Sequence, residues 1–323
     1  MCEIRITDVA QFLSENDNYV ILSHTNPDGD TVGAGIGLAL LLEKAGKKVN
    51  ALVCDKEIPE YLRFLHGSER YVCDYELCEG DVVVAVDTAS PQMLGALAEK
   101  FESITDLRID HHEISTPFAK SNFCVPNASS CCEIIADISS ILGISTPDMA
   151  TALLCGIMTD SGSFKYSCTG ASTHRCAAYL MDAGADLNYI SSSLYENREL
   201  SSLMASSFAV TKMKMCLDGR VAYSSVSCAE KEELGLSDSD FSECASLLRQ
   251  IKGVEIAIFL RQVTDGEYKL STRSRESIDS AAICQTFGGG GHARAAGATI
   301  LGDSAEQILE NIIKEVQKQL ENT

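Results

Sequence analysis

The stretch Ser23-His24-Thr25-Asn26-Pro27-Asp28-Gly29-Asp30-Thr31 decides the fold of this chain. An apolar run precedes it, residues 19–22, and predicts a buried strand. A segment rich in Gly, Ala and Leu follows it, residues 32–45, and predicts a helix that ends at Gly46. A strand, a tight turn and a helix form the repeating unit of α/β folds, in which functional groups lie at the carboxyl ends of the strands.

The side chains of this turn suit a divalent cation. Pro27 and Gly29 fix the turn, so that one imidazole and two carboxylates can converge, those of His24, Asp28 and Asp30. Such ligands suit a hard or borderline ion, for example Mn²⁺ or Mg²⁺. Taken alone, the stretch is equally compatible with a polar turn that holds an incidental histidine.

Length and composition narrow the class of protein. With 323 residues, 45% of them apolar, the chain is long enough for two domains with full-sized cores. No apolar run reaches the length of a membrane span and no signal peptide opens the chain, so we expect a cytoplasmic protein without a membrane partner. The 14 cysteines are scattered and form no Cys-x-x-Cys pair, which predicts reduced, buried side chains.

The formal net charge of −20 limits the nucleic acids that the chain can bind. A protein this acidic has no general attraction for long nucleic acid, because each phosphate adds repulsion. A small phosphorylated substrate remains possible, since a site that holds metal ions carries its own positive charge.

Strand and helix signals alternate through residues 1–190, which we expect to form one α/β domain with a doubly wound, mostly parallel sheet. Ser130 and Glu133 have the spacing of a capping box at the start of one of these helices. Further strands are expected over residues 48–54, 81–86 and 107–109, and further helices from Pro91, over 130–142, over 147–160 and over 173–183.

The second half of the chain has a different pattern. The composition of residues 191–211 predicts a linker helix, and the pattern of residues 212–323 predicts a smaller α+β domain. Asp218-Gly219 and Asp265-Gly266 each separate two strand-like runs, which is the signal of a β-hairpin. Helices are expected over residues 240–251, 278–286 and 305–320.

Acidic and imidazole side chains recur where strands of the first domain are expected to end. Besides the opening turn, they stand at Asp87, at Asp110-His111-His112 and at Asp160. The strands of a parallel sheet end at one edge, so these groups can meet there. Buried carboxylates in such number would repel one another unless they bind cations. Two ions bridged by one carboxylate would use this number of ligands.

The order of these motifs resembles the DHH phosphoesterase superfamily, which is named for its Asp-His-His motif. The match runs through the opening turn, Val86-Asp87-Thr88-Ala89, Asp110-His111-His112 and Thr159-Asp160-Ser161-Gly162. The run from Gly288 to Gly297 resembles the signature of the DHH-associated substrate domain. Together the two matches cover essentially the whole chain. The size and the absence of added nucleic-acid-binding modules are most similar to the stand-alone nanoRNase and pAp-phosphatase branch.

The resemblance implies a centre with two Mn²⁺ ions, for which Mg²⁺ or Co²⁺ could substitute. It implies that His24, Asp28 and Asp87 hold one ion. It implies a second set of ligands that shares Asp87 with the first: Asp30, Asp87, His111 and Asp160. Asp110 is expected to orient His111 from behind, and His112 to face the scissile phosphate. The expected catalytic residues are His112, Asp110 and Asp87.

The glycine-rich run is expected to bind phosphate. Glycines let backbone N–H groups approach a phosphate, and arginine supplies a forked donor for it. Arg273 and His292 are our first choices for substrate contacts. The expected substrate-binding set is Arg273, Arg275, Gly289, Gly290, Gly291, His292 and Arg294. For Arg275 and Arg294, the alternative is a purely structural role.

The resemblance implies attack by a metal-bound hydroxide at phosphorus. The expected substrates are di- to pentanucleotide RNA, degraded to mononucleotides, and 3′-phosphoadenosine 5′-phosphate (pAp), dephosphorylated to AMP. No long nucleic acid is expected as a partner, and a homodimer is left open. Two alternatives remain: a phosphodiesterase for cyclic dinucleotides of the c-di-AMP type, and a catalytically idle nucleotide sensor.

Two other patterns are interpreted as structural. Gly33-Ala34-Gly35-Ile36-Gly37 loosely resembles a dinucleotide-binding fingerprint, but its spacing is wrong and it lies too far past the strand. Its small residues predict close packing of the helix on the sheet. His66 and His174 have no partner ligands nearby in the sequence and are expected to be ordinary residues.

Overall fold

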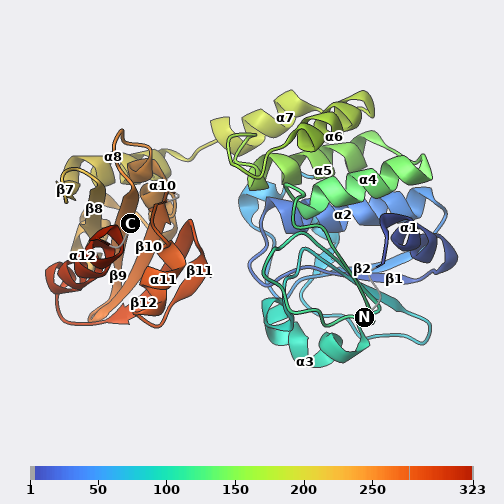
Figure 1. The fold of residues 1–323 in the computed structure, drawn as a ribbon, viewed down its shortest axis with the longest axis horizontal. Coiled ribbons are helices and arrows are strands. Elements are labelled where there is room, and N and C mark those ends of the chain that lie inside the picture. The colour runs from blue at the N-terminus through green and yellow to red at the C-terminus, as the bar shows by residue number, and fades with distance from the viewer. Residues whose placement is uncertain (1–3, 276, 322–323) are drawn as a thin grey trace. The chain divides into compact units, whose positions relative to one another are not determined.

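The computed structural model describes residues 4–275 and 277–321, apart from the side chain of His292. The chain divides into two compact units, Met1–Asn197 and Arg198–Thr323 (Figure 1).

The first unit is built on a six-stranded sheet in which every neighbouring pair is parallel. The strand order is β3-β2-β1-β4-β5-β6, so the predicted parallel α/β fold is confirmed. The chain moves outward from β1 in one direction and later resumes at β4 on its other side. In a doubly wound sheet this switch point is where ligands bind. The strands are β1 Tyr19–Leu22, β2 Val49–Val53, β3 Tyr71–Val72, β4 Val82–Val86, β5 Leu107–Asp110 and β6 Ser121–Cys124.

Helical segments cover both faces of this sheet. On one face, side chains of α1, α2, α4 and α5 share a core with alternate residues of β1, such as Tyr19 and Ile21. On the other face, Leu94, Leu97 and Phe101 cover the remaining apolar residues of the central strands. Figure 1 shows α2, α4 and α5 side by side above the sheet. The helices are α1 Ile6–Glu15, α2 Gly29–Lys44, α3 Ala98–Phe101, α4 Cys131–Leu142, α5 Pro147–Asp160, α6 Ala171–Asp182 and α7 Leu187–Ser191, with the 3₁₀ turns η1 Glu60–Leu62, η2 Ser68–Arg70, η3 Pro91–Leu97 and η4 Glu102–Ile104.

Two details of this unit correct the expectations. The segment from Pro91 is not one α-helix but the 3₁₀ segment η3 followed by the short α3, because Gly95 has a positive φ of 60° that interrupts the helical path. Two glycines of α2, Gly33 and Gly37, pack against another helix, whereas Gly35 faces the sheet as expected, where a Cβ atom would lie 2.1 Å from Tyr71 Oη of β3. A Cβ atom on Gly33 would lie 2.5 Å from the carbonyl oxygen of Ala152, and one on Gly37 would lie 2.3 Å from Leu153, both on α5.

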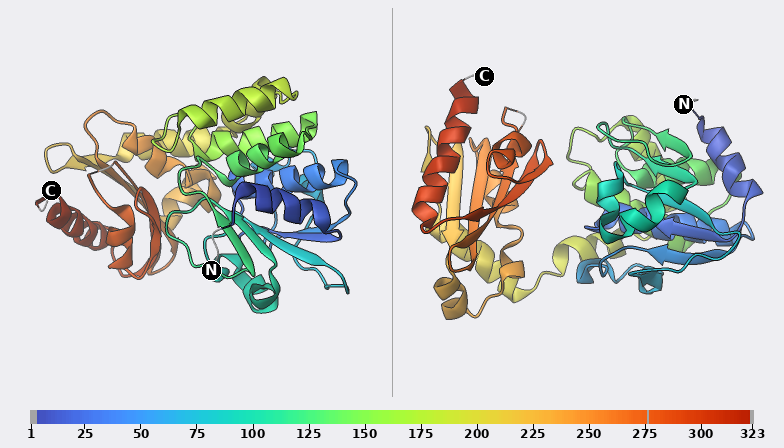
Figure 2. Two further views of the ribbon diagram at one scale, coloured as in Figure 1. Left: turned by 45° about the vertical axis from the view of Figure 1, so that its right-hand side comes forward. Right: turned by 90° about the horizontal axis from the view of Figure 1, so that it is seen from below.

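The second unit is an α+β sandwich around another six-stranded sheet, ordered β11-β12-β10-β9-β8-β7. Both predicted hairpins are present as antiparallel pairs, β7 with β8 and β9 with β10. Helices α11 and α12 pack on one face of this sheet, and α8 and α10 on the other, as can be followed in the ribbon of Figure 2. The strands are β7 Lys214–Cys216, β8 Val221–Val226, β9 Ile256–Thr264, β10 Glu267–Ser274, β11 Gly290–His292 and β12 Ala295–Leu301, and the helices are α8 Leu200–Lys212, α9 Cys228–Leu234, η6 Asp238–Phe241, α10 Cys244–Arg249, α11 Ser280–Gln285 and α12 Ala305–Glu321.

The segment expected to be a linker helix, residues 191–211, contains the π-helical turn η5 Ser192–Glu196 and most of α8. Ala205 and Ala209 of α8 are buried in the core of the second unit. None of the helices among the described residues combines the length and the apolar character needed to cross a bilayer.

Candidate metal centre

The first unit gathers six acidic and imidazole side chains at the switch point between β1 and β4. His24 follows β1 with one residue between, and Asp87 follows β4 directly. Asp28 and Asp30 open α2, while His111 follows β5. Asp160 is the last residue of α5, which confirms the helix expected over residues 147–160 but means that Asp160 does not follow a strand as the other ligands were expected to. Of the expected ligands, none is left outside.

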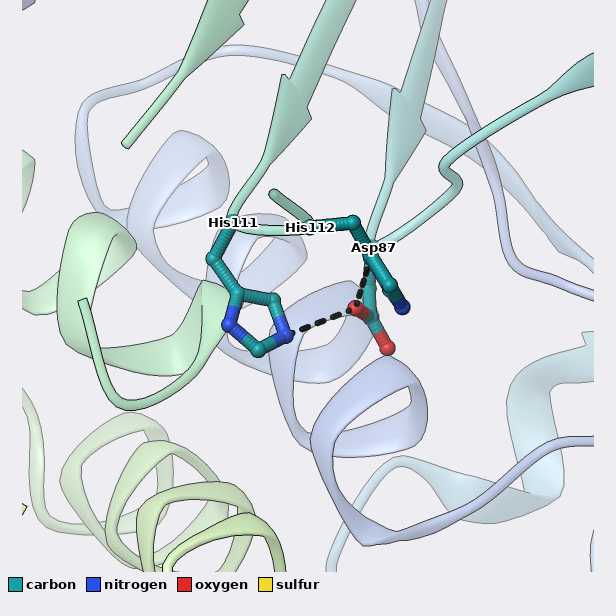
Figure 3. Close-up of side chains that lie close together, drawn as sticks. All are labelled: Asp87, His111 and His112. Carbon is teal, nitrogen blue, oxygen red and sulfur yellow. Dashed lines mark ion pairs between the residues drawn. The ribbon is translucent and has the colours of Figure 1, made fainter. Parts of the chain in front are cut away.

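The side chains fall into three overlapping groups, in which Asp87 joins His24 and Asp28, Asp87 also joins His111 and His112, and His111 joins Asp30 and Asp160. In one group, His24 Nε2 lies 3.4 Å from Asp87 Oδ2 and 3.8 Å from Asp28 Oδ1. On the other side of Asp87, His111 Nε2 lies 3.5 Å from Asp87 Oδ1, as Figure 3 shows. His66 and His174 belong to none of the potential metal-binding groups found among the described residues.

A further group joins His111 to two more carboxylates, those of Asp30 and Asp160. His111 Nε2 lies 3.7 Å from Asp30 Oδ2 and 3.5 Å from Asp160 Oδ2. These separations exceed an ordinary N–H···O hydrogen bond, which spans 2.7–3.2 Å. The ligand atoms of His111, Asp30 and Asp160 all lie within 4.8 Å of one another, close enough to share a divalent ion.

Asp87 fits the part of a bridging ligand. Its Oδ1 atom is buried and has no hydrogen-bond partner, although the imidazoles of His111 and His112 lie 3.5 and 3.7 Å away. Its backbone has φ +51°, in the left-handed region that is uncommon for residues other than glycine. A buried carboxylate oxygen without a donor, on a strained backbone, is the kind of group that a cation satisfies. The donor set therefore fits divalent cations.

The pKa values record how tightly the charges are crowded. Burial raises the pKa of Asp30 to about 7, and the charge of Asp87 adds to the increase. Burial and the charge of Asp30 raise the pKa of Asp160 to about 8. Burial lowers the pKa of His111, but its contact with Asp87 and the charges of the surrounding carboxylates outweigh burial and raise it to about 11. Without a cation, the carboxylates can be neutralised only by protons.

We expect the melting temperature Tm of the metal-free protein to fall as the pH rises from about 6.5 to about 9. The pKa of His24 in the folded protein, about 9, lies above its usual 6.5, so the stabilisation is complete below pH 6.5 and is lost as the pH rises through 9. The pKa of Asp160 is raised from 3.8 to about 8, so its contribution destabilises the folded protein progressively more as the pH rises from 3.8 to 8. Thermal denaturation of chelator-treated protein at several pH values measures this.

Added Mn²⁺ or Mg²⁺ should raise Tm most at the alkaline end of this series, because ligands bind metal in their deprotonated forms. A Tm that stays level or rises with pH in the metal-free protein would contradict the crowding of charge described above.

Two aspartates of the centre also cap helices. Asp28 Oδ1 accepts hydrogen bonds from the N–H groups of Asp30 and Thr31, both at 3.1 Å, at the start of α2. Asp30 caps a different helix: its Oδ2 accepts from Cys131 N at 2.7 Å and its Oδ1 from Cys132 N at 3.0 Å, at the start of α4. These N–H groups have no partner within their helices, so both carboxylates complete the helix ends.

The expected role of Asp110 is wrong in one respect. Asp110 Oδ1 lies 2.7 Å from His112 Nδ1, so Asp110 orients His112 and not His111. The Nδ1 atom of His111 faces the carbonyl oxygen of Ala128 at 3.3 Å instead.

Glu133 departs from the expected capping box with Ser130, since its carboxylate accepts from the N–H group of Ser129.

Arg108 was not among the expected site residues, yet its Nη1 donates to Asp110 Oδ2 at 2.8 Å. The signal was a single charged residue inside the apolar strand of residues 107–109, where a lone charge needs a partner.

In the second unit, the backbone brings the two preferred substrate residues onto one rung of the sheet. Arg273 on β10 pairs with Ala295 on β12, which pairs in turn with His292 on β11. The side chain of His292 lies outside the described part of the structure. Arg273 Nη1 donates to its neighbour's carbonyl, Thr272 O, at 3.0 Å. This bond leaves most of the guanidinium's donors to other partners.

Arg275 and Arg294 bind the backbone of their own unit. Arg275 Nε donates to Val254 O at 2.8 Å, and Arg294 Nη1 donates to Ile278 O at 2.9 Å and to Arg275 O at 3.1 Å. These bonds support the structural alternative for both residues.

The glycine-rich run forms part of a hairpin, β11 with β12, rather than only a loop. A Cβ atom on Gly289 would lie 2.2 Å from Gly297 O, and one on Gly291 would lie 2.6 Å from Ala295 O, so packing against β12 requires glycine at both positions. Gly290 has open space on its Cβ side. Of the three, Gly290 is the one where close approach of a ligand, and not packing, could account for glycine.

Known proteins share this architecture. Residues 18–157 match the DHH family, N-terminal domain, and residues 218–322 match the DHHA1 domain. The chain is 30% identical over 303 residues to the bifunctional oligoribonuclease and PAP phosphatase NrnA of Thermus thermophilus, covering 93% of this chain and 89% of that protein. It is 27% identical over 333 residues to the cyclic-di-AMP phosphodiesterase PdeA of Listeria monocytogenes, but spans only 48% of that protein's length. The crystal structure of an exopolyphosphatase-related protein from Bacteroides fragilis superposes with a TM-score of 0.88 at 25% identity, covering 98% of this chain and 95% of that one.

Fold, site and relatives together define a phosphohydrolase. The chain belongs to the DHH family, as the order of its motifs had indicated.

Proposed function

We propose that this chain is a divalent-metal-dependent phosphoesterase that hydrolyses short oligoribonucleotides to mononucleotides and pAp to AMP. The observation that carries the proposal is the position of Asp87, a buried carboxylate within reach of both His24 and His111 at the switch point of the sheet. The Thermus thermophilus relative, named for both activities, supports this class of substrate.

The proposed ligands divide around Asp87. His24, Asp28 and Asp87 would hold one ion, and Asp30, Asp87, His111 and Asp160 the other, with Mn²⁺ preferred and Mg²⁺ or Co²⁺ as substitutes. When bound, such a pair of ions would lower the pKa of an attacking water and neutralise charge on the phosphate. The protein supplies the ligands on rigid elements, so little reorganisation is needed when a substrate arrives.

His112 is the proposed donor to the substrate. Asp110 holds its Nδ1 atom at 2.7 Å, which fixes the orientation of the ring. Burial lowers the pKa of His112, but the hydrogen bond with Asp110 and the charges of Asp87 and Asp110 more than offset burial, and the pKa is raised. A protonated imidazole can donate a hydrogen bond to a phosphate oxygen or a proton to the leaving group.

The net charge favours short substrates. In this proposal the positive charge available to substrate is confined to the metal centre and the neighbourhood of Arg273. Every phosphate beyond these meets an acidic protein. We therefore expect kcat/KM to fall as RNA lengthens beyond about five nucleotides, since each further phosphate adds repulsion without a new contact.

The test is a comparison of kcat/KM for RNA oligomers of two to about twenty nucleotides at fixed Mn²⁺ and salt. Efficiency that stays level or rises toward the longest oligomer would refute the short-substrate assignment. The same assay should include pAp, DNA dinucleotides and cyclic dinucleotides, each with Mn²⁺ and with Mg²⁺.

A second candidate is a cyclic dinucleotide phosphodiesterase, which the similarity to the Listeria monocytogenes protein favours. Linear and cyclic dinucleotides present the same phosphodiester to the metal centre and differ in how the distal nucleotide is held. A preference for c-di-AMP over pAp and linear dinucleotides would establish this alternative. No turnover of any of these substrates by metal-loaded protein would favour a nucleotide sensor.

A further inference from the structure

The structure contains a buried arginine that the proposed reaction does not yet use. Arg108 lies on β5 and is 1% exposed, and Asp110, two residues further along the same strand, is fully buried. Alternate residues of a strand share a face, so the two side chains lie side by side. A buried charge persists only where it is paired and hydrogen-bonded.

Every nitrogen of the guanidinium has a partner. Nη1 donates to Asp110 Oδ2 at 2.8 Å and to the carbonyl oxygens of Thr88 and Ala89 at 3.2 and 3.3 Å. Nη2 donates to Ser115 Oγ at 3.4 Å, and Nε donates to Asn122 Oδ1 at 3.2 Å. The guanidinium is therefore fixed from three sides: by its own strand, by the turn after β4, and by β6 with the loop before it.

The other oxygen of Asp110 continues this chain of contacts to the centre. Oδ1 faces His112 Nδ1 at 2.7 Å, while Oδ2 is held by Arg108. A carboxylate accepts, so Nδ1 of His112 carries the hydrogen and its Nε2 atom points away from Asp110. One carboxylate, clamped at both oxygens, thus connects Arg108 to His112.

The potential metal ligands nearest to this network also have contacts outside it, although Arg108 holds the carbonyl groups of Thr88 and Ala89, which follow Asp87. His111 Nδ1 contacts Ala128 O, and the N–H group of Asp87 donates to Ile109 O at 2.9 Å. Loss of the guanidinium should therefore disturb His112 more than the ligand groups.

We propose that Arg108 is a positioning residue for phosphoester hydrolysis, which acts through Asp110 to hold the ring of His112 in one orientation, with Nδ1 toward Asp110 and Nε2 away from it. The inference rests on the proposed function. The competing explanation is that Arg108 merely satisfies polar groups inside the fold. The two explanations differ in whether the effect of Arg108 passes through His112.

The experiment is a double-mutant cycle on kcat in the full chain, with pAp and Mn²⁺. Arg108→Met is measured alone and in a His112→Ala background, with substrate in excess and enough enzyme to resolve slow turnover. We expect Arg108→Met to lower kcat about 10- to 100-fold alone, in the range of other residues that support active groups, and less than about twofold in the His112→Ala background. KM and the Tm increase on adding Mn²⁺ should stay close to the wild type. The matched control is Lys120→Met, which removes an exposed cation whose Nζ atom lies 2.7 Å from Asp106 Oδ1. This variant should leave kcat unchanged.

A readout without turnover accompanies the cycle. Spectra of ¹⁵N-labelled imidazole rings should show His112 protonated at Nδ1 in the wild type, assigned by its disappearance in His112→Ala. In Arg108→Met the His112 signals should broaden or shift while those of His24 and His111 stay in place. This readout also keeps the two hypotheses separate, because an inactive wild-type protein would refute the proposed function and leave the imidazole spectra to decide on Arg108.

Equal losses of kcat in both backgrounds, unchanged His112 signals, or loss of the Mn²⁺-dependent Tm increase would overturn the proposal. Removal of the guanidinium leaves Asp110 without its counter-charge, so Arg108→Lys serves as a second variant that keeps the charge but cannot reproduce the fork. It should lower kcat less than Arg108→Met does. Failure of both variants to fold would place Arg108 in the support of the fold alone and would likewise overturn the proposal.

Discussion

Replacing Asp87 by asparagine is expected to lower kcat by at least about a thousandfold, which corresponds to about 4 kcal/mol of barrier. The substitution removes a charged ligand from both proposed ion positions at once. Asparagine tolerates the left-handed backbone that Asp87 adopts, with φ +51°, better than most other residues that have a side chain. The change therefore tests the charge rather than the backbone, whereas Asp87→Ala would add strain to the loss of the ligand.

Two controls make this result interpretable. Asp81→Asn, just before the amino end of β4, alters a carboxylate that binds Asn50 and Cys78 and should leave turnover unchanged. The Tm increase on adding Mn²⁺ should disappear in Asp87→Asn and persist in Asp81→Asn. Wild-type turnover by metal-loaded Asp87→Asn would rule out the bridging role.

Replacing Arg273 by alanine is expected to weaken pAp binding by about 1.5–3 kcal/mol, the usual effect of losing a hydrogen bond to a charged group. The metal centre should remain intact, because Arg273 belongs to the second unit and its described hydrogen bond reaches only Thr272 O. The loss should appear in KM or in the dissociation constant of pAp, with the Mn²⁺-dependent Tm increase retained.

The matched control for this prediction is Lys269→Ala. Lys269 lies on the same face of β10, four residues before Arg273, and is exposed. It should leave pAp affinity within about twofold, since surface charges contribute little on their own. An equal loss in both variants would mean that general charge, and not a contact from Arg273, attracts the substrate. An affinity unchanged in Arg273→Ala would remove Arg273 from the substrate site.

The elements that place the centre were predictable because their sequences contain one strong signal each. The β-branched run of β4 and the apolar run of β1 are buried along most of their lengths, and such runs seldom form anything but central strands. The edge strand β6 was missed, because Ser121–Cys124 is half-buried and lacks both an apolar run and a clear alternation. The glycine-rich strand β11 was missed for a related reason, since glycine has no side chain whose pattern could indicate a strand.

The convergence of the proposed ligands was predictable from sequence, but the partners of these side chains were not. Spacing places His111 and His112 after the same strand, yet only the backbone of the turn decides which ring faces Asp110. Likewise, no sequence pattern indicates that Asp30 caps α4, because the two lie about a hundred positions apart along the chain. Such contacts depend on how the helices pack, which the short-range pattern does not contain.

The two capping aspartates restrict how this centre could be redesigned for another metal. Asp28 and Asp30 reach the first N–H groups of α2 and α4 with short side chains, and a histidine, cysteine or glutamate in either place would leave those groups without an acceptor at the right distance. His24, His111 and Asp160 have no such duty at a helix start among the contacts described above. Substitutions that change the metal preference, by design or in evolution, should therefore be tolerated at these three positions. At Asp28 and Asp30 they would also remove a helix cap.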